Sequence, residues 1–211
     1  MAARKSLFTD MSIDTVLDVG ANTGQFALQI RREGFAGRII SFEPLSTAYA
    51  KLATAAADDP LWNAYHCALG STSGSAQINI AGNSWSSSIL PMLESHRTAA
   101  PESAYVGTEE VTIRTLDETF TEVCRPAATA FMKVDTQGFT MNVFRGGEDT
   151  LTRLAGLQVE MSLVALYADE PLIPDLLAYL YGRGFRLVYI EPEFWDSRGL
   201  QLQVNGLFVK T

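Results

Sequence analysis

Acidic residues stand at the ends of two apolar runs near the start of this sequence. Asp18 lies close to the end of the first run, and Glu43 directly follows the second. Between them, Gly20 and Gly24 bracket a turn without side-chain bulk at its ends, so the backbone there can approach a ligand closely. The order of strand, glycine turn, helix, strand and acid predicts a mononucleotide-binding βαβ unit.

The details of this unit indicate which ligand it binds. The turn reads Gly20-Ala21-Asn22-Thr23-Gly24 and lacks the middle glycine of the dinucleotide motif G-x-G-x-x-G. A carboxylate at Asp18 would repel a pyrophosphate and favours a cationic ligand, such as the ammonium and sulfonium groups of S-adenosylmethionine. Glu43 is placed to accept both ribose hydroxyls, in charge-assisted bonds of about 1.5–3 kcal/mol each. The alternative is an ordinary doubly wound domain whose turn happens to contain glycine.

Length and composition indicate the number of domains and the general class of protein. The 211 residues are enough for one domain, 1–211, and their 47% apolar and 19% charged content is that of a globular protein. The net charge of −8 and the lack of a basic run argue against nucleic-acid binding. No signal peptide or membrane span is recognised, so we expect a cytoplasmic protein. Cys67 and Cys124 stand apart and are expected to be buried thiols.

The apolar patterns predict an α/β fold with a doubly wound, mostly parallel, seven-stranded sheet. Its parallel strands, in the spatial order 3-2-1-4-5, are expected at 15–19, 38–42, 62–69, 130–135 and 157–161, with an antiparallel pair at 185–190 and 200–209. Alternation at 74–80 suggests an exposed extra strand. Ser46 is a candidate helix cap. Residues 1–14 form an N-terminal arm, and 82–105 are a candidate loop over the site.

The ordered motifs resemble those of the FkbM family of S-adenosylmethionine-dependent methyltransferases. The matching stretches are 16–24 with Phe26, 41–44, 68–70, 87–88, 115–117, Lys133-Val134-Asp135-Thr136-Gln137-Gly138, 159–160, 166–167 and the closing strands. The resemblance implies a Rossmann-like class I methyltransferase that transfers a methyl group to oxygen, often a sugar hydroxyl of a glycolipid, glycopeptide or polyketide. The expected cofactor contacts are Asp18, Gly20, Ala21, Asn22, Gly24, Glu43, Pro44, Ala68 and Asp135.

Two positions depart from the family pattern. Gln137 and Asn205 stand where carboxylates are common, so we predict no metal site. A divalent ion assisted by Glu160 stays open as an alternative.

Methyl transfer to a hydroxyl needs a base within hydrogen-bond reach. Asp135, at the tip of the fourth strand, is the candidate, and strand alternation places Lys133 on the same side, where it can keep Asp135 ionised. Glu160 and His96 are further catalytic candidates. The plainer alternatives are that Asp135 and Glu160 cap neighbouring helices and that Lys133 forms a structural ion pair.

Candidate acceptor contacts are Ser86 and Ser88 in a serine-rich stretch, Gln137, and Tyr167. Trp85, Tyr167 and Trp195 could stack on a sugar or belong to the core. The expected partner is a small or glycosylated acceptor, with a homodimer left open. Competing interpretations are a protein, lipid or phenolic acceptor, a degenerate nucleotide-binding module, and an NAD oxidoreductase, which the missing G-x-G-x-x-G opposes.

Overall fold

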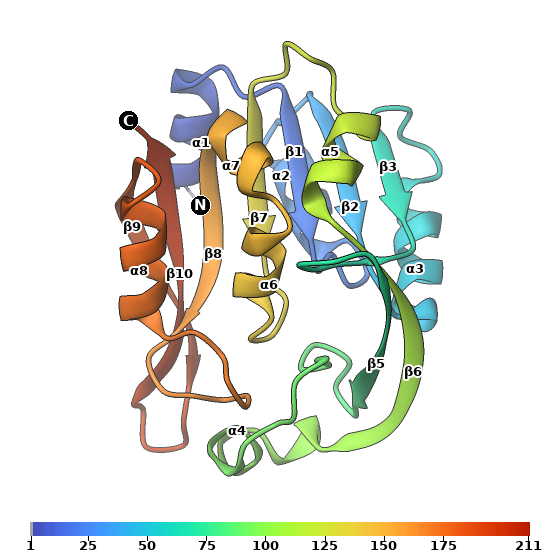
Figure 1. Ribbon diagram of the computed structural model, residues 1–211, viewed down its shortest axis with the longest axis vertical. Helices are drawn as coiled ribbons and strands as arrows, with labels where there is room; N and C mark the ends of the chain where they lie inside the picture. The colour runs from blue at the N-terminus through green and yellow to red at the C-terminus, as the bar shows by residue number, and fades with distance from the viewer. Residues whose placement is uncertain (1) are drawn as a thin grey trace.

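Seven strands form the central sheet of the computed structural model, which describes residues 2–211, in the order β3-β2-β1-β7-β8-β10-β9 (Figure 1). They are β1 (Thr15–Val19), β2 (Arg38–Phe42), β3 (Trp62–Tyr65), β7 (Ala130–Val134), β8 (Leu154–Ser162), β9 (Phe185–Trp195) and β10 (Gln201–Lys210). The first five in space are parallel, and β10 runs antiparallel to both β8 and β9. The predicted fold class, strand order and terminal antiparallel pair are confirmed.

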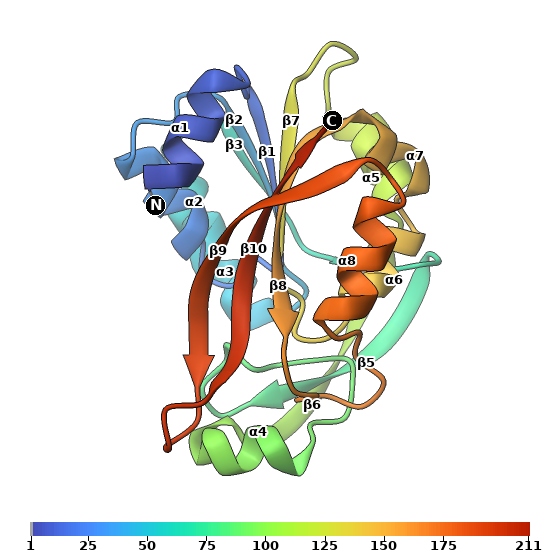
Figure 2. The same ribbon diagram turned by 90° about the vertical axis from the view of Figure 1, so that its left-hand side faces the viewer.

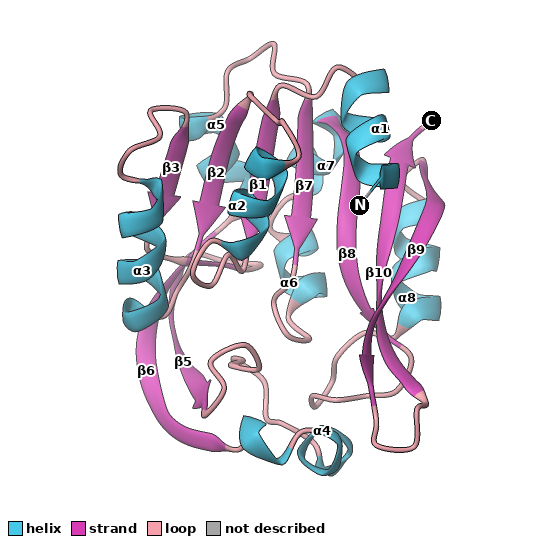
Figure 3. Cartoon of the chain, turned by 180° about the vertical axis from the view of Figure 1, so that it is seen from behind, coloured by secondary structure: helices cyan, strands magenta, loops and turns pink. Residues whose placement is uncertain are grey.

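Helices cover both faces of this sheet (Figures 1 and 3). One face carries α1 (Ala2–Asp10), α2 (Gln25–Arg32) and α3 (Ser46–Ala56), and the other carries α5 (Leu116–Val123), α6 (Thr140–Arg145), α7 (Glu148–Arg153) and α8 (Ile173–Tyr181). All residues of β1 and β7 are buried, as expected of parallel strands between two helical layers. In α2, Phe26, Ala27 and Ile30 are buried because helical spacing places them on one stripe.

A smaller sheet extends from the carboxyl ends of the central strands, as Figure 2 shows in edge view. Its order is β4-β6-β5, with β4 (Ala68–Leu69), β5 (Gly74–Ala81) and β6 (Tyr105–Arg114). The short helix α4 (Glu94–Ala99) and the 3₁₀ turn η1 (Pro101–Ser103) connect β5 to β6. Together these elements lie beyond the carboxyl ends of the central strands (Figure 2).

Two local predictions were wrong. The single strand expected at 62–69 is divided, because the chain turns after Tyr65 and the next two paired residues join β6 rather than β2. Ser46 does not cap α3: Leu45 holds the cap position, and the Ser46 hydroxyl donates to Glu109. Gly146 and Gly147 separate α6 from α7.

Among the helices of residues 2–211, none combines the length and apolar character that a bilayer-crossing segment needs.

Candidate functional site

A cavity of about 540 Å³ opens at the carboxyl ends of the central strands. Its walls come from the turn after β1, the tips of β2, β7 and β8, the strands β9 and β10, and the segment 83–89 with α4. Ligands of open α/β sheets bind at this edge, at the point where the strand order reverses. The size lies in the usual range for small-molecule sites, about 300–1,000 Å³.

The glycine turn after β1 forms one wall. Gly20 has a φ of +78°, and a Cβ built on it would lie 1.8 Å from the carbonyl oxygen of Asp135. Only glycine therefore lets the β1 turn pack against the tip of β7. Gly20, Ala21 and Asn22, which are predicted cofactor contacts, line the cavity. Gly24 does not line the cavity: it is the N-cap of α2, and a Cβ there would meet the Trp62 ring at 2.9 Å.

Glu43 lies beside that turn. One carboxylate oxygen accepts the backbone N–H of Asn22 at 2.8 Å, and the other accepts that of Leu45 at 2.9 Å. Burial raises the pKa of Glu43 to about 7, against the lowering effect of these two bonds. Glu43, Pro44 and Ala68 all line the cavity. Each carboxylate oxygen keeps a lone pair for a further donor.

The structure corrects the interpretation of Asp18. Its side chain is fully buried between β2 and β7 and does not line the cavity. The Ser41 hydroxyl donates to it at 3.4 Å, and the Lys133 ammonium lies 3.8 Å away. Burial raises its pKa to about 6, partly offset by Lys133. Asp18 therefore acts on the site through Lys133 and does not touch a ligand in the cavity.

The structure brings the predicted side chains of β7 and β8 together. The Lys133 ammonium lies 3.1 Å from one carboxylate oxygen of Asp135. The Gln137 side-chain amide donates to the other at 2.8 Å and to Glu160 at 3.0 Å. Burial opposes the charge of Lys133, but the carboxylates of Asp135 and Asp18 raise its pKa overall. Burial, reinforced by Asp135, raises the pKa of Glu160 well above its ordinary value.

Hydrogen bonds fix both the backbone and the side chain of Gln137. Its φ of +49° is uncommon for a residue with a side chain. The Ser88 hydroxyl donates to its backbone carbonyl at 2.6 Å, and the Tyr167 hydroxyl lies 2.7 Å from its side-chain oxygen. The Tyr167 hydroxyl also lies 3.0 Å from the carbonyl oxygen of Ser86. The amide of Gln137 is thus fixed in orientation, with its two N–H bonds directed at carboxylates.

This geometry corrects the prediction that Tyr167 contacts the acceptor. It is fully buried and does not line the cavity, so it supports Gln137 from behind rather than contacting an acceptor. Ser86 and Ser88 do line the cavity, although both are buried. Trp85 lines it with its side chain 65% exposed, whereas Trp195 lies outside it.

His96 projects from α4 to the cavity wall and is buried. Its ring packs edge-on against Tyr167, with centroids 5.1 Å apart, and against Phe194 at 5.6 Å. Its Nδ1 is closed off from solvent and has no hydrogen-bond partner. Burial lowers the pKa of His96, which keeps the imidazole neutral near pH 7.

Several lining residues were not found from the sequence. They are polar and come from distant elements: Arg4, Glu102, Gln158, Glu191, Glu193 and Gln203. The alternation of Glu191 and Glu193 along β9 is the one signal that could have placed two of them on a common face. In residues 2–211, no three His, Cys, Asp or Glu side chains are arranged to hold a metal ion.

Comparisons with known proteins agree with this architecture. The family model described as the methyltransferase FkbM domain matches residues 18–187. An rRNA methylase from Streptococcus thermophilus superposes with a TM-score of 0.52 at 11% identity, over 99% of this chain and 94% of that chain. Magnesium protoporphyrin IX methyltransferase from Synechocystis, solved with bound S-adenosylmethionine, gives 0.51 at 10% identity, over 99% and 76%.

Fibrillarin from Aeropyrum pernix, also with bound S-adenosylmethionine, gives a TM-score of 0.50 at 12% identity, over 93% of this chain and 66% of that chain. At such low identity these structures share the fold, and the family model carries the assignment. Among curated proteins, none has a significant sequence match to this chain. Because the FkbM model spans most of its length, the chain belongs to the FkbM methyltransferase domain family and is an S-adenosylmethionine-dependent methyltransferase.

Proposed function

We propose that the protein transfers the methyl group of S-adenosylmethionine to a hydroxyl of a sugar, in a glycosylated metabolite or a glycolipid. The observation that carries this proposal is the setting of Asp135. Its carboxylate reaches the same cavity as Glu43 and the glycine turn, and both of its oxygens are held, one by Lys133 and one by Gln137. A fixed carboxylate beside the cofactor is what a hydroxyl acceptor requires.

The cofactor is expected to lie across the glycine turn. The ribose hydroxyls would donate to the free lone pairs of Glu43, and the adenine would lie near Ala68 and Leu69, which line the same wall. The amino-acid part would follow the exposed backbone of Gly20 and Ala21, toward Asp135. This orientation directs the sulfonium methyl group at the tip of β7.

The reaction is an in-line displacement. The acceptor oxygen forms its bond to the methyl carbon as the carbon–sulfur bond breaks, and the sulfur keeps the electron pair as S-adenosylhomocysteine. The hydroxyl proton passes to Asp135. Lys133 keeps Asp135 ionised before transfer and Gln137 fixes its orientation, so positioning supplies much of the acceleration.

Polar side chains on the remaining walls favour a hydroxyl-rich acceptor. Gln158, Gln203 and Asn205 bring amides to the cavity, and the serine-rich segment brings Ser86 and Ser88, of which Ser88 already donates its hydroxyl to Gln137. Amides and hydroxyls both donate and accept, as several sugar hydroxyls need. A protein, lipid or phenolic acceptor would not require so many of them.

The first experiment is a calorimetric titration with S-adenosylhomocysteine. Micromolar binding to the wild type that weakens at least tenfold in Glu43→Ala supports the cofactor position. Absence of binding to the wild type contradicts it and favours the degenerate module.

The second experiment measures transfer of labelled methyl groups from S-adenosylmethionine to a panel of glycosides. The Asp135→Asn variant should lose turnover about 10²–10⁴-fold while its S-adenosylhomocysteine affinity stays within about threefold. Turnover near the wild-type rate would show that Asp135 is not the base.

A further inference from the structure

The cavity extends from the strand tips to the first helix, α1. We call this part of it the α1 side, and its lining residues are Arg4 from α1, Gln25, Phe26 and Gln29 from α2, Lys133 from β7 and Gln158 from β8. Lys133 is paired in register with Gln158 and lies two residues before Asp135, so this side begins just below the strand tips. The glycine turn leads into α2, so the proposed path of the cofactor's amino-acid part runs toward the α1 side.

Arg4 is buried, and several contacts fix its guanidinium group. It donates to the side-chain oxygen of Gln158 at 3.0 Å and to the two carboxylate oxygens of Glu33 at 3.1 and 3.2 Å. Its Cζ lies 4.9 Å from the centroid of the Phe26 ring. A guanidinium group has five N–H donors, so these bonds leave donors unused, and Nε has no partner. An acceptor group on a ligand would therefore complete the bonding of a buried cation.

The charges of the lining favour Arg4 as the place for a ligand carboxylate. Among the described residues, the Lys and Arg side chains that line the cavity are Arg4 and Lys133. Lys133 already lies beside two carboxylates, 3.1 Å from Asp135 and 3.8 Å from Asp18. Arg4 is paired with one, Glu33, whose side chain is 21% exposed and so partly screened by water. A second carboxylate is therefore accommodated more easily at Arg4 than at Lys133.

The amino-acid part of the cofactor carries both an ammonium and a carboxylate group, which the cavity attracts in different directions. The ammonium is attracted to the carboxylate of Asp135, whose backbone packs against Gly20 in the turn after β1. The carboxylate is repelled by Asp135 and is attracted to the α1 side. The Lys133 ammonium and the Arg4 Cζ both lie within 5.5 Å of the centroid of the Phe26 ring, so both positive charges are near the start of α2.

We propose that Arg4 binds the amino-acid carboxylate of S-adenosylmethionine, which makes α1 part of the cofactor site. This inference rests on the proposed function, because it uses the cofactor position given there. Arg4 precedes residues 18–187, which the FkbM model matches, so membership of the family assigns it no role. The competing explanation is structural: Arg4 would only tie α1 to α2 through Glu33.

The test compares S-adenosylhomocysteine with its decarboxylated analogue, which keeps the nucleoside, the thioether and the amine. Each is titrated calorimetrically at pH 8 into the wild type and into Arg4→Met, which keeps an unbranched side chain against Phe26. The wild type should bind S-adenosylhomocysteine at least tenfold more tightly than the analogue. In Arg4→Met this preference should fall at least fivefold, while the affinity for the analogue stays within about threefold. Binding of the analogue also shows that the variant is folded.

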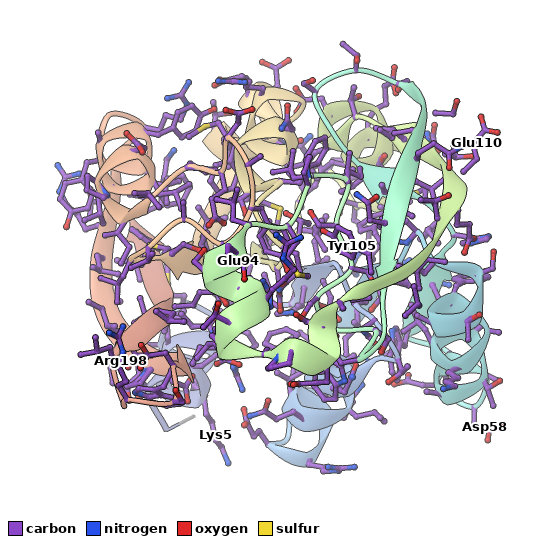
Figure 4. All side chains as sticks on the ribbon, turned by 90° about the horizontal axis from the view of Figure 1, so that it is seen from below. Lys5, Asp58, Glu94, Tyr105, Glu110 and Arg198 are labelled. Atoms are coloured by element: carbon purple, nitrogen blue, oxygen red, sulfur yellow. The ribbon has the colours of Figure 1, made fainter. Side chains whose placement is uncertain are left out.

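Lys5→Met is the matched control. Lys5 is next to Arg4 in α1 but exposed, and Figure 4 shows its side chain pointing away from the molecule. This variant removes the same charge from the same helix and should keep the full preference.

Arg4→Lys tests the inference even where Arg4→Met does not fold. Lysine keeps the charge but not the planar pair of donors that matches a carboxylate. The preference for S-adenosylhomocysteine should therefore fall at least threefold in Arg4→Lys, with little change in the affinity for the analogue.

Equal affinities of the wild type for the two ligands would overturn the inference. So would an unchanged preference in Arg4→Met or Arg4→Lys, or a loss of preference in Lys5→Met. A weakening of both ligands by the same factor in Arg4→Met is the result that a purely structural Arg4 predicts, and it would overturn the inference as well. Failure of the wild type to bind either ligand would instead refute the cofactor position in the proposed function, so the two failures are distinguishable.

Discussion

The ammonium of Lys133 lies between two carboxylates, 3.8 Å from Asp18 and 3.1 Å from Asp135. Asp18 is fully buried and Lys133 is largely buried, so bulk water stabilises neither charge well. Removal of one member leaves an uncompensated buried charge, which costs more than the pair itself contributes.

We therefore expect Lys133→Met to lower the free energy of unfolding by about 3–5 kcal/mol at pH 8. The double variant Lys133→Met with Asp18→Asn should recover at least half of that loss, because it removes the stranded carboxylate as well. Urea denaturation measures both. Lys51→Met, on the exposed side of α3, is the control and should change stability by no more than about 0.5 kcal/mol. Equal losses in the single and double variants would contradict the prediction.

The raised pKa of Glu43 leads us to expect that protons are released when the cofactor binds. In the free protein burial raises its pKa to about 7, so much of it is protonated below that pH. Ribose hydroxyls that donate to the ionised form lower its pKa in the complex, so binding at pH 6–7 expels protons. Affinity for S-adenosylhomocysteine should then rise with pH up to about 7 and level off above it.

Calorimetry in buffers of different ionisation enthalpy measures this release directly. The Glu43→Gln variant, which cannot ionise, should bind more weakly and show no such release. Proton uptake by the wild type, or an equal release in the variant, would refute the role of Glu43.

Sequence pattern found these side chains but not their surroundings. Alternation along a strand says which residues share a face, and it correctly placed Lys133 beside Asp135. Alternation does not say whether that face opens on a cavity. Asp18 was therefore interpreted as a ligand contact, although its side chain is fully buried between β2 and β7. Tyr167 lies in the irregular segment after β8, where no alternation indicates which side chains are buried, so its burial was missed.

At the scale of the elements, the turn after β1 leaves no space for a side chain at Gly20. A Cβ at Gly20 would overlap the backbone of Asp135 at the tip of β7, and its positive φ adds strain. Gly20→Ala should therefore separate the two strand tips and weaken S-adenosylhomocysteine binding at least tenfold.

Gly34 provides the control for backbone strain alone. Its φ is +97°, and a Cβ there would meet nothing within 4 Å. Gly34→Ala should destabilise the protein by about 1–2 kcal/mol and leave ligand affinity unchanged. Calorimetry and thermal unfolding separate the two effects, and similar ligand affinities in both variants would contradict the argument.

The regular strands and the family motifs were predictable because β1, β2 and β7 are mostly apolar runs, each followed directly by a glycine turn or an acid. In the smaller sheet, the alternation at 74–80 correctly predicted β5, but the division between β3 and β4 and the helix α4 were not predicted. The split between β3 and β4 depends on which sheet each segment joins, a long-range pairing with no local signal. The helix α4 has six residues and buries only His96, which is too little for a periodic pattern.

Across the whole molecule, the cavity draws its walls from α1 at one end of the described chain to β10 at the other. Such a site exists only in the folded state, so any ligand that fills it stabilises the fold by mass action. S-adenosylhomocysteine at 100 times its Kd should add about 2.7 kcal/mol. For a chain of this length that corresponds to a rise in Tm of about 5–10 °C.

Thermal unfolding with increasing S-adenosylhomocysteine measures this shift, and adenosine at the same concentrations serves as a weaker ligand for comparison. No dependence of Tm on S-adenosylhomocysteine would contradict binding in this cavity.

The positions of the three tryptophans allow ligand binding in the cavity to be followed by fluorescence. Trp62 is buried behind the start of α2, and Trp195 ends β9 outside the cavity, whereas Trp85 is 65% exposed on the cavity wall. A ligand that covers Trp85 changes the polarity around one indole of three. The intrinsic fluorescence of the unlabelled protein is thus a reporter of occupancy, and Trp85→Phe would silence it.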